Sequence, residues 1–239
     1  MKKISEKVFI NVVANVIICL LVVVVFSLSF MDDIIAATNT ENEKAIYKGN
    51  TANRNVSLMF NVCDGSAEYI DEILSLLAKH NVKATFFVTG VWVNKNADVL
   101  KKIYAAGHEL GNHGYLHRDH AKLSMLQNKE EITLCHQLVE SCVGVQMTLF
   151  APPNGSFSPT TLLAARDLDY KTVMWSKDTG DSGGQDAALI YSRATKNTGN
   201  GELILCHPTK ETALMLDRIL EYFKKNNFKA VTVSENIAP

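Results

Sequence analysis

Hydrophobic and polar positions divide the chain into a short apolar head and a longer body of alternating patterns. From Val8 to Phe30 there is no charged residue, a length that can span a bilayer as a helix. Three lysines precede this stretch and two aspartates follow it. This asymmetry places the N-terminus in the cytoplasm and the body on the other side of the membrane.

We expect residues 1–37 to be a signal anchor, because the apolar stretch is long for a cleaved signal peptide. A signal peptide cut after Ala37 is the alternative, and the body would then be secreted. The polar residues 38–54 are expected to link the membrane segment to a domain at residues 55–239.

The body alternates between strand and helix patterns. Residues 56, 58, 60 and 62 are apolar with the period of a strand, and residues 70, 73, 74 and 77 have helical spacing. The same patterns predict strands at 56–62, 84–88, 108–112, 148–151, 171–175, 202–206 and 229–233. They predict helices at 69–77, 99–106, 129–142, 160–168, 187–196 and 212–223. This order is typical of an α/β fold with a mostly parallel sheet. About 185 residues are few for a closed eight-fold barrel, which favours a distorted or incomplete (β/α) barrel.

Composition narrows the classes of partner. A net charge of -1 and a pI near 6.7 give no basic field for nucleic acid. The five cysteines have no spacing typical of a metal site.

Candidate chemistry gathers after the strands, where parallel folds place their sites. His113 and His117 are four residues apart and can chelate one divalent metal, such as Zn or Co. Asp64, after the first strand, is the candidate oxygen ligand. His207 follows a buried strand and suits a general acid, and Asp178 or Asp181 could orient it.

Several segments resemble the polysaccharide deacetylase family, also called the NodB homology domain or carbohydrate esterase family 4. Residues 107–117 look like its metal-binding histidine motif and residues 150–156 like its RPPYG segment. Residues 175–181 look like its DxxDW segment and residues 205–208 like its LxH segment. Residues 112–114 and 207–209 are particularly similar to the sporulation-associated branch in Gram-positive bacteria.

The resemblance implies hydrolysis of N-acetyl groups on a cell-wall glycan in a distorted barrel. It implies a metal held by Asp64, His113 and His117, with His207 as the acid and Asp178 as its partner. The substrate pocket implied by the same motifs is Pro153, Asn154, Gly155, Trp175, Asp181 and Leu205.

The sequence departs from the family where the general base is expected. The first motif of the family is TFDDG, but residues 59–65 place either Asn61 or Cys63 at the base position. The arginine that would orient the base is Ala151. Neutral asparagine takes up no proton at useful pH.

Three functions are consistent with these residues. The first is a membrane-anchored, metal-dependent deacetylase of a peptidoglycan-like polymer, slowed by the missing base. The second is a glycan-binding pseudoenzyme in envelope or spore assembly. The third is a metal-dependent amidohydrolase with a small non-glycan substrate, which only the fold supports.

Overall fold

The protein is described from a computed structural model that covers residues 6–38, 44–63, 65, 67–184 and 186–239. It has two compact units, Met1–Glu43 and Lys44–Pro239. The first contains helix α1 (Glu6–Thr38), whose stretch Phe9–Ser27 is long and apolar enough to cross a membrane. Its side chains are exposed from residue 9 to residue 27. A core helix would bury such a surface, so α1 is a candidate membrane span.

The second unit is built on one parallel sheet. The strands are β1 (Asn55–Val62), β2 (Thr85–Val88), β3 (Glu109–Asn112), β4 (Leu149–Phe150), β5 (Lys171–Thr172), β6 (Lys177–Asp178), β7 (Glu202–Cys206) and β8 (Lys229–Ala230). Their order is β5-β4-β3-β2-β1-β7-β6, with β8 pairing at the start of β1. Every pairing between these strands is parallel. Within the described residues, β5 and β6 are the sheet edges, which confirms the incomplete barrel.

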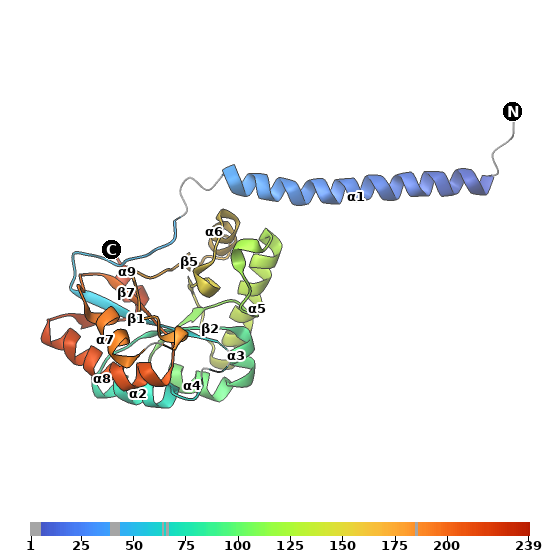
Figure 1. The fold of residues 1–239 in the computed structure, drawn as a ribbon. Coiled ribbons are helices and arrows are strands. Elements are labelled where there is room, and N and C mark those ends of the chain that lie inside the picture. Colours follow the sequence, from blue (N-terminus) through green and yellow to red (C-terminus); the bar gives the residue numbers. More distant parts are fainter. Residues whose placement is uncertain (1–5, 39–43, 64, 66, 185) are drawn as a thin grey trace. The chain divides into compact units, whose positions relative to one another are not determined.

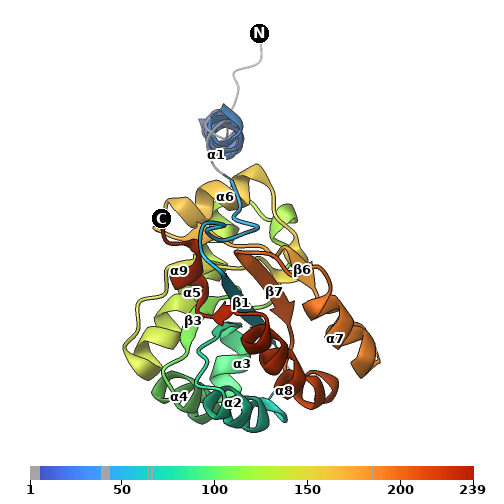
Figure 2. The same ribbon diagram turned by 90° about the vertical axis from the view of Figure 1, so that its left-hand side faces the viewer.

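Helices form an arc along one side of this sheet (Figures 1 and 2). The helices of the second unit are α2 (Ile70–Lys79), α3 (Gly90–Lys95), α4 (Ala97–Ala105), α5 (Met125–Val143), α6 (Pro159–Arg166), α7 (Ala187–Thr195), α8 (Lys210–Lys225) and α9 (Val233–Ile237). α9 lies outside the arc, since its Val233 packs with Met59 and Phe87 on the other face of the sheet. In Figure 2 the arc runs from α5 through α4, α2 and α8 to α7. α5 also packs on α6, and α7 on α8.

The central strand is buried on both of its faces. Leu58 and Phe60 belong to the large core shared with the helices, whereas Met59 belongs to a smaller cluster with Phe87 and Leu203. This alternation follows from the two-residue period of a strand. A sheet covered on both faces explains the apolar runs in the sequence.

The predicted elements are present with shifted ends, and three were not predicted. These are α3, β6 and α9, each of six residues or fewer. The strand expected to reach residue 233 ends at Ala230, because Thr232 caps α9 and Val233 begins it. The described part of the expected linker bonds to the body: Ile46 pairs with Val173 and Lys48 with Glu202. This segment therefore joins the β5 side of the sheet to β7.

Candidate active site

The candidate residues come directly after the strands, on the side of the sheet where the carboxyl ends of the parallel strands lie. Each strand end is bonded to the next: His113 N donates to Val88 O at 3.0 Å, and Ala151 N donates to Asn112 O at 3.0 Å. The loop after β3 therefore starts in a fixed position. We call residues 113–117 the histidine loop.

His113 is buried and held by a backbone carbonyl. Its Nδ1 donates to Ala151 O at 2.6 Å, since a carbonyl oxygen only accepts. The neutral ring therefore keeps its lone pair on Nε2, the atom available to a metal. Ala151 lacks the arginine side chain of the family, but its backbone still orients the histidine.

His117 completes the pair. The ring centroids of His113 and His117 are 5.1 Å apart with an interplanar angle of 67°. His117 has a φ of 57°, in the left-handed region, so the loop turns sharply to bring the second ring back. Burial, followed by the charge of His117, lowers the pKa of His113 to about 3. Burial also lowers the pKa of His117. Both rings are thus kept neutral, the form that binds metal.

The donor set suits a divalent metal as far as the structure describes it. Two neutral imidazoles are ligands that Zn and Co accept. The third predicted ligand, Asp64, lies outside the described residues. Among the described residues, no group of three or more histidine, cysteine or acidic side chains is arranged to hold a metal.

The opposite side of the site carries a histidine that is bonded at its Nδ1 and at its backbone amide. His207 Nδ1 contacts Asp181 Oδ1 at 2.8 Å, and His207 N donates to Asp181 Oδ2 at 2.6 Å. Thr212 Oγ1 donates to the same Oδ2 at 2.6 Å. Burial alone would raise the pKa of Asp181, but these bonds and the charge of His207 lower it overall. The registers of β7, β1, β2 and β3 place His207 and His113 at the same end of the sheet. The charge of His207 is also among the causes that lower the pKa values of both loop histidines.

The expectation that Asp178 is the partner of His207 is wrong. Asp178 is exposed, and its Oδ1 accepts from Gly180 N at 2.7 Å in a local turn. Gly180 has a φ of 72°, a left-handed turn that carries the chain on to Asp181. The second aspartate of the segment, buried with 2% of its surface exposed, therefore takes the role expected of the first. The spacing of the residues had left Asp181 open as this partner, whereas the family resemblance placed it in the substrate pocket.

One of the two candidates for the base position, Asn61, is a buried amide. Asn61 lies near the end of β1 with 3% of its surface exposed, and its Oδ1 is buried with no hydrogen-bond partner among the described residues. Buried polar atoms are usually bonded. An unsatisfied acceptor here marks a position that a ligand or water would complete. Cys63, the other candidate, is half-buried just after β1.

Residues expected to line the substrate pocket lie at or after the carboxyl ends of the strands. Pro153 is buried, whereas Asn154 is exposed and has a φ of 55°. A Cβ on Gly155 would lie 2.7 Å from the ring of Trp175, so the turn packs directly on the indole. Leu205 is on β7 with 4% of its surface exposed.

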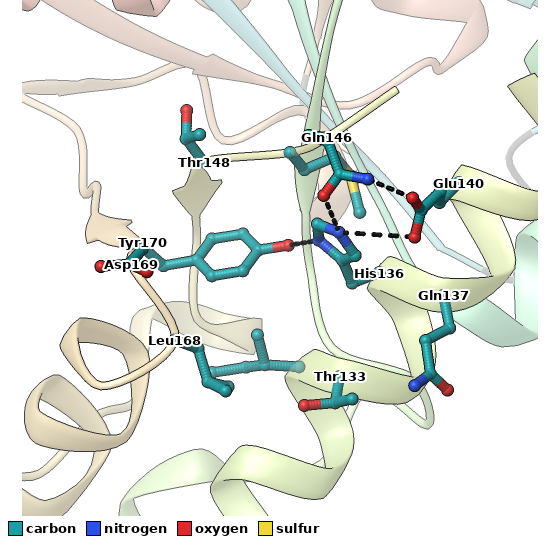
Figure 3. Close-up of a pocket in the computed structure, with 11 residues that line it drawn as sticks. Thr133, His136, Gln137, Glu140, Gln146, Thr148, Leu168, Asp169 and Tyr170 are labelled. Carbon is teal, nitrogen blue, oxygen red and sulfur yellow. Dashed lines mark hydrogen bonds and ion pairs between the residues drawn. The ribbon is translucent and has the colours of Figure 1, made fainter. Parts of the chain in front are cut away.

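A separate hollow of about 390 Å³ lies between α5 and the segments that lead into β4 and β5. Four of its polar side chains, those of Tyr170, His136, Gln146 and Glu140, are bonded to one another in a row (Figure 3). His136 contacts Tyr170 Oη at 2.5 Å and Gln146 Oε1 at 2.8 Å, and Gln146 donates to Glu140. These groups satisfy each other, so the row is a structural network.

The sequence reading missed Glu131, a buried residue of α5 that bonds to the histidine loop. One signal was available. Glu131 is a charged residue beside the apolar positions Ile132 and Cys135 of a predicted amphipathic helix. A charge beside the buried stripe of a helix is expensive unless it is bonded.

Comparison with known proteins shows the family of this chain. The family profile described as Polysaccharide deacetylase matches residues 48–173, more than half of the chain. The chain belongs to the polysaccharide deacetylase family. It is a family of hydrolases that act on carbon–nitrogen bonds.

Relatives include proteins with and without a stated activity. The chain is 38% identical to the uncharacterized protein YlxY of Bacillus subtilis over 80% of this chain and 59% of YlxY. It is 32% identical to a peptidoglycan-N-acetylglucosamine deacetylase of Bacillus cereus over 70% of this chain and 62% of that protein. The chain thus spans about three fifths of these two relatives.

Solved structures include an inactive relative. A carbohydrate esterase family 4 pseudoenzyme from Bacillus anthracis is 32% identical with a TM-score of 0.80, covering 82% of this chain and 70% of that one. A mutant of that pseudoenzyme with restored enzymatic activity also has a TM-score of 0.80, at 30% identity over 82% of this chain and 72% of the mutant.

Proposed function

We propose that the body removes N-acetyl groups from an amino-sugar polymer of the cell wall, slowly and with the help of a divalent metal. The observation that carries this proposal is the bonded pair of His207 and Asp181 beside the two histidines of the loop. Relatives named as peptidoglycan deacetylases support the substrate class.

The loop supplies the metal side of the reaction. His113 presents Nε2 because its Nδ1 is bonded to Ala151 O, and His117 presents the second ring. Asp64 is proposed as the third ligand. A divalent metal such as Zn or Co, when bound, supplies polarisation of the acetamide carbonyl and a water of lowered pKa.

His207 supplies the acid side. Its Nδ1 proton is held by the Asp181 carboxylate, which stabilises the positively charged ring. Nε2 is then the atom that gives a proton to the departing nitrogen. Thr212 satisfies the remaining lone pairs of Asp181, so the carboxylate stays in place during the transfer.

The missing step is removal of the proton from water. We assign the base position of the family to Asn61, with Cys63 as the alternative, and an amide oxygen takes up no proton near neutral pH. Loss of a general base costs about 10²–10⁴-fold in rate. We therefore expect turnover far below that of a complete site.

A second candidate is a non-catalytic protein that binds the same polymer in envelope or spore assembly. Asn61 and Ala151 favour it, because the base and the arginine that would orient it are replaced together. The similarity to a pseudoenzyme of the same fold favours it as well.

We also propose that α1 anchors the body on the outer side of the cell membrane, where the polymer lies. Lysines before the apolar stretch and aspartates after it support this orientation. Secretion after cleavage is the alternative, and the size of the mature protein in cells separates the two.

The test is acetate release from N-acetylated peptidoglycan and chito-oligomers, with binding of the same polymers measured separately. The protein is loaded with Zn²⁺ or Co²⁺, and His207→Ala is the control. Slow release that His207→Ala abolishes supports the deacetylase. Binding without release, unchanged in His207→Ala, supports the non-catalytic function. Neither binding nor release would overturn both.

A further inference from the structure

The backbone of the histidine loop is bonded at each position between its two histidines. Gly114 N donates to Asn112 Oδ1 at 2.9 Å. The carbonyls of Gly114 and Tyr115 accept from Gly90 N and Val91 N, both at 3.0 Å and both at the start of α3. Three contacts thus fix the course of the loop from β3 and α3.

The other two amides between the histidines, those of Tyr115 and Leu116, share one partner. Glu131 Oε2 accepts from Tyr115 N at 2.9 Å and from Leu116 N at 2.8 Å. Glu131 is on α5 and has 4% of its surface exposed. Arg118 Nη1 lies 4.0 Å from Oε1 and partly balances the charge. The carboxylate reaches across from a different helix to hold the middle of the loop.

Glu131 also limits the room beside the loop. A Cβ on Gly114 would lie 3.4 Å from Glu131 Oε2 and 2.9 Å from His120 Nε2. The chain passes there with a φ of 75°, which glycine adopts without strain. The loop therefore fits closely against the carboxylate.

A buried carboxylate is expensive unless hydrogen bonds repay its lost hydration. Here both bonds go to the segment that carries the two imidazoles. We propose that Glu131 is a positioning residue that fixes the two imidazoles relative to each other and so sets the affinity of the histidine pair for a divalent metal. The inference rests on the metal role in the proposed function. Residues that orient ligands from outside the metal site typically change affinity by about 10–100-fold when lost.

The experiment measures Zn²⁺ affinity by competition with a chelator, and amide hydrogen exchange of the metal-free protein. Glu131→Ala removes the oxygen that accepts both hydrogen bonds, so we expect Zn²⁺ to bind about 10–100-fold more weakly. Tyr115 and Leu116 should exchange faster. Glu131→Gln keeps one acceptor oxygen and the side-chain shape. The Zn²⁺ affinity of this variant should therefore fall between those of the wild type and Glu131→Ala. It also serves if Glu131→Ala does not fold.

The matched control is Glu202→Gln. Glu202 is also buried, with 7% of its surface exposed, and it accepts from Gly199 N at 3.3 Å and pairs with Lys48 at 3.2 Å. It lies at the start of β7, the opposite end from the site. We expect Glu202→Gln to lower the melting temperature and leave Zn²⁺ affinity unchanged.

The outcomes separate the two proposals. Wild-type affinity in both Glu131 variants would overturn the positioning role alone. An equal loss in Glu202→Gln would also overturn it, because the effect would then be general destabilisation. A wild-type protein that binds no Zn²⁺ would overturn both this role and the metal part of the proposed function.

Discussion

Asp181→Asn tests the acid side of the site with a change of one functional group. The carboxylate accepts three hydrogen bonds, two on Oδ2 from His207 N and Thr212 Oγ1 and one on Oδ1 from His207 Nδ1. Asparagine has one acceptor oxygen. This oxygen takes the place of Oδ2, where His207 N and Thr212 Oγ1 donate, so the NH₂ group of the asparagine faces Nδ1 of His207. The ring proton must then move to Nε2.

The magnitude follows from these contacts. One charge-assisted bond is replaced and two are weakened to neutral ones, which costs about 1–3 kcal/mol of unfolding free energy. For a body of roughly 200 residues, each kcal/mol lowers the melting temperature by about 2–4 °C. Thermal unfolding measures the loss, and nitrogen NMR of the His207 ring reports which atom carries the proton.

Asp178→Asn is the matched control in the same segment. Its carboxylate is exposed and accepts one bond from Gly180 N, so the expected cost is about 0.5 kcal/mol or less. Equal losses in the two variants, or an unchanged ring proton in Asp181→Asn, would refute the assignment of Asp181 as the partner of His207.

Two further predictions concern the stability of the fold. Burial and then the charge of Lys83 lower the pKa of His108 to about 4, while Ala84 N donates to its Nδ1 at 3.2 Å. The unfolded state therefore binds the proton first. Stability is complete above pH 6.5 and falls toward pH 4, by about 2 kcal/mol at pH 5. The free energy of unfolding, measured with denaturant at each pH, should change less with pH in His108→Phe than in the wild type. An equal dependence on pH in the two proteins contradicts the reasoning. A Cβ on Gly111 would lie 2.4 Å from the buried ring of Phe87, so Gly111→Ala should cost about 1–3 kcal/mol in thermal unfolding. A Gly111→Ala protein as stable as the wild type would contradict this prediction and would show that the Phe87 ring can move aside.

The fold was predictable because its strands and longer helices have strong periods. β1 begins one residue before its predicted start and ends where predicted. Seven of its eight positions are buried, which makes the segment apolar and its period easy to detect. α3 was not predictable by period, because it has six residues and begins at a glycine. Its start depends on Thr89, whose side chain accepts from Trp92 N.

The site was predictable where motif spacing determines it and not where loop geometry does. His113 and His117 follow β3 and His207 follows β7, and the parallel registers put these strand ends on the same side of the sheet. The choice between Asp178 and Asp181 depends on the left-handed turn at Gly180, which spacing does not contain. Glu131 is more than a dozen residues from the loop, and only the packing of α5 places its carboxylate there.

The central claim is that the missing carboxylate at position 61 limits turnover. It is tested most directly by the rate of acetate release from metal-loaded Asn61→Asp compared with wild type, with Asn61→Ala as the variant that changes the side chain without adding a base. The account predicts an increase of roughly 10²–10⁴-fold in Asn61→Asp and none in Asn61→Ala. An Asn61→Asp protein that binds metal and glycan as wild type does, and releases acetate no faster, would contradict it.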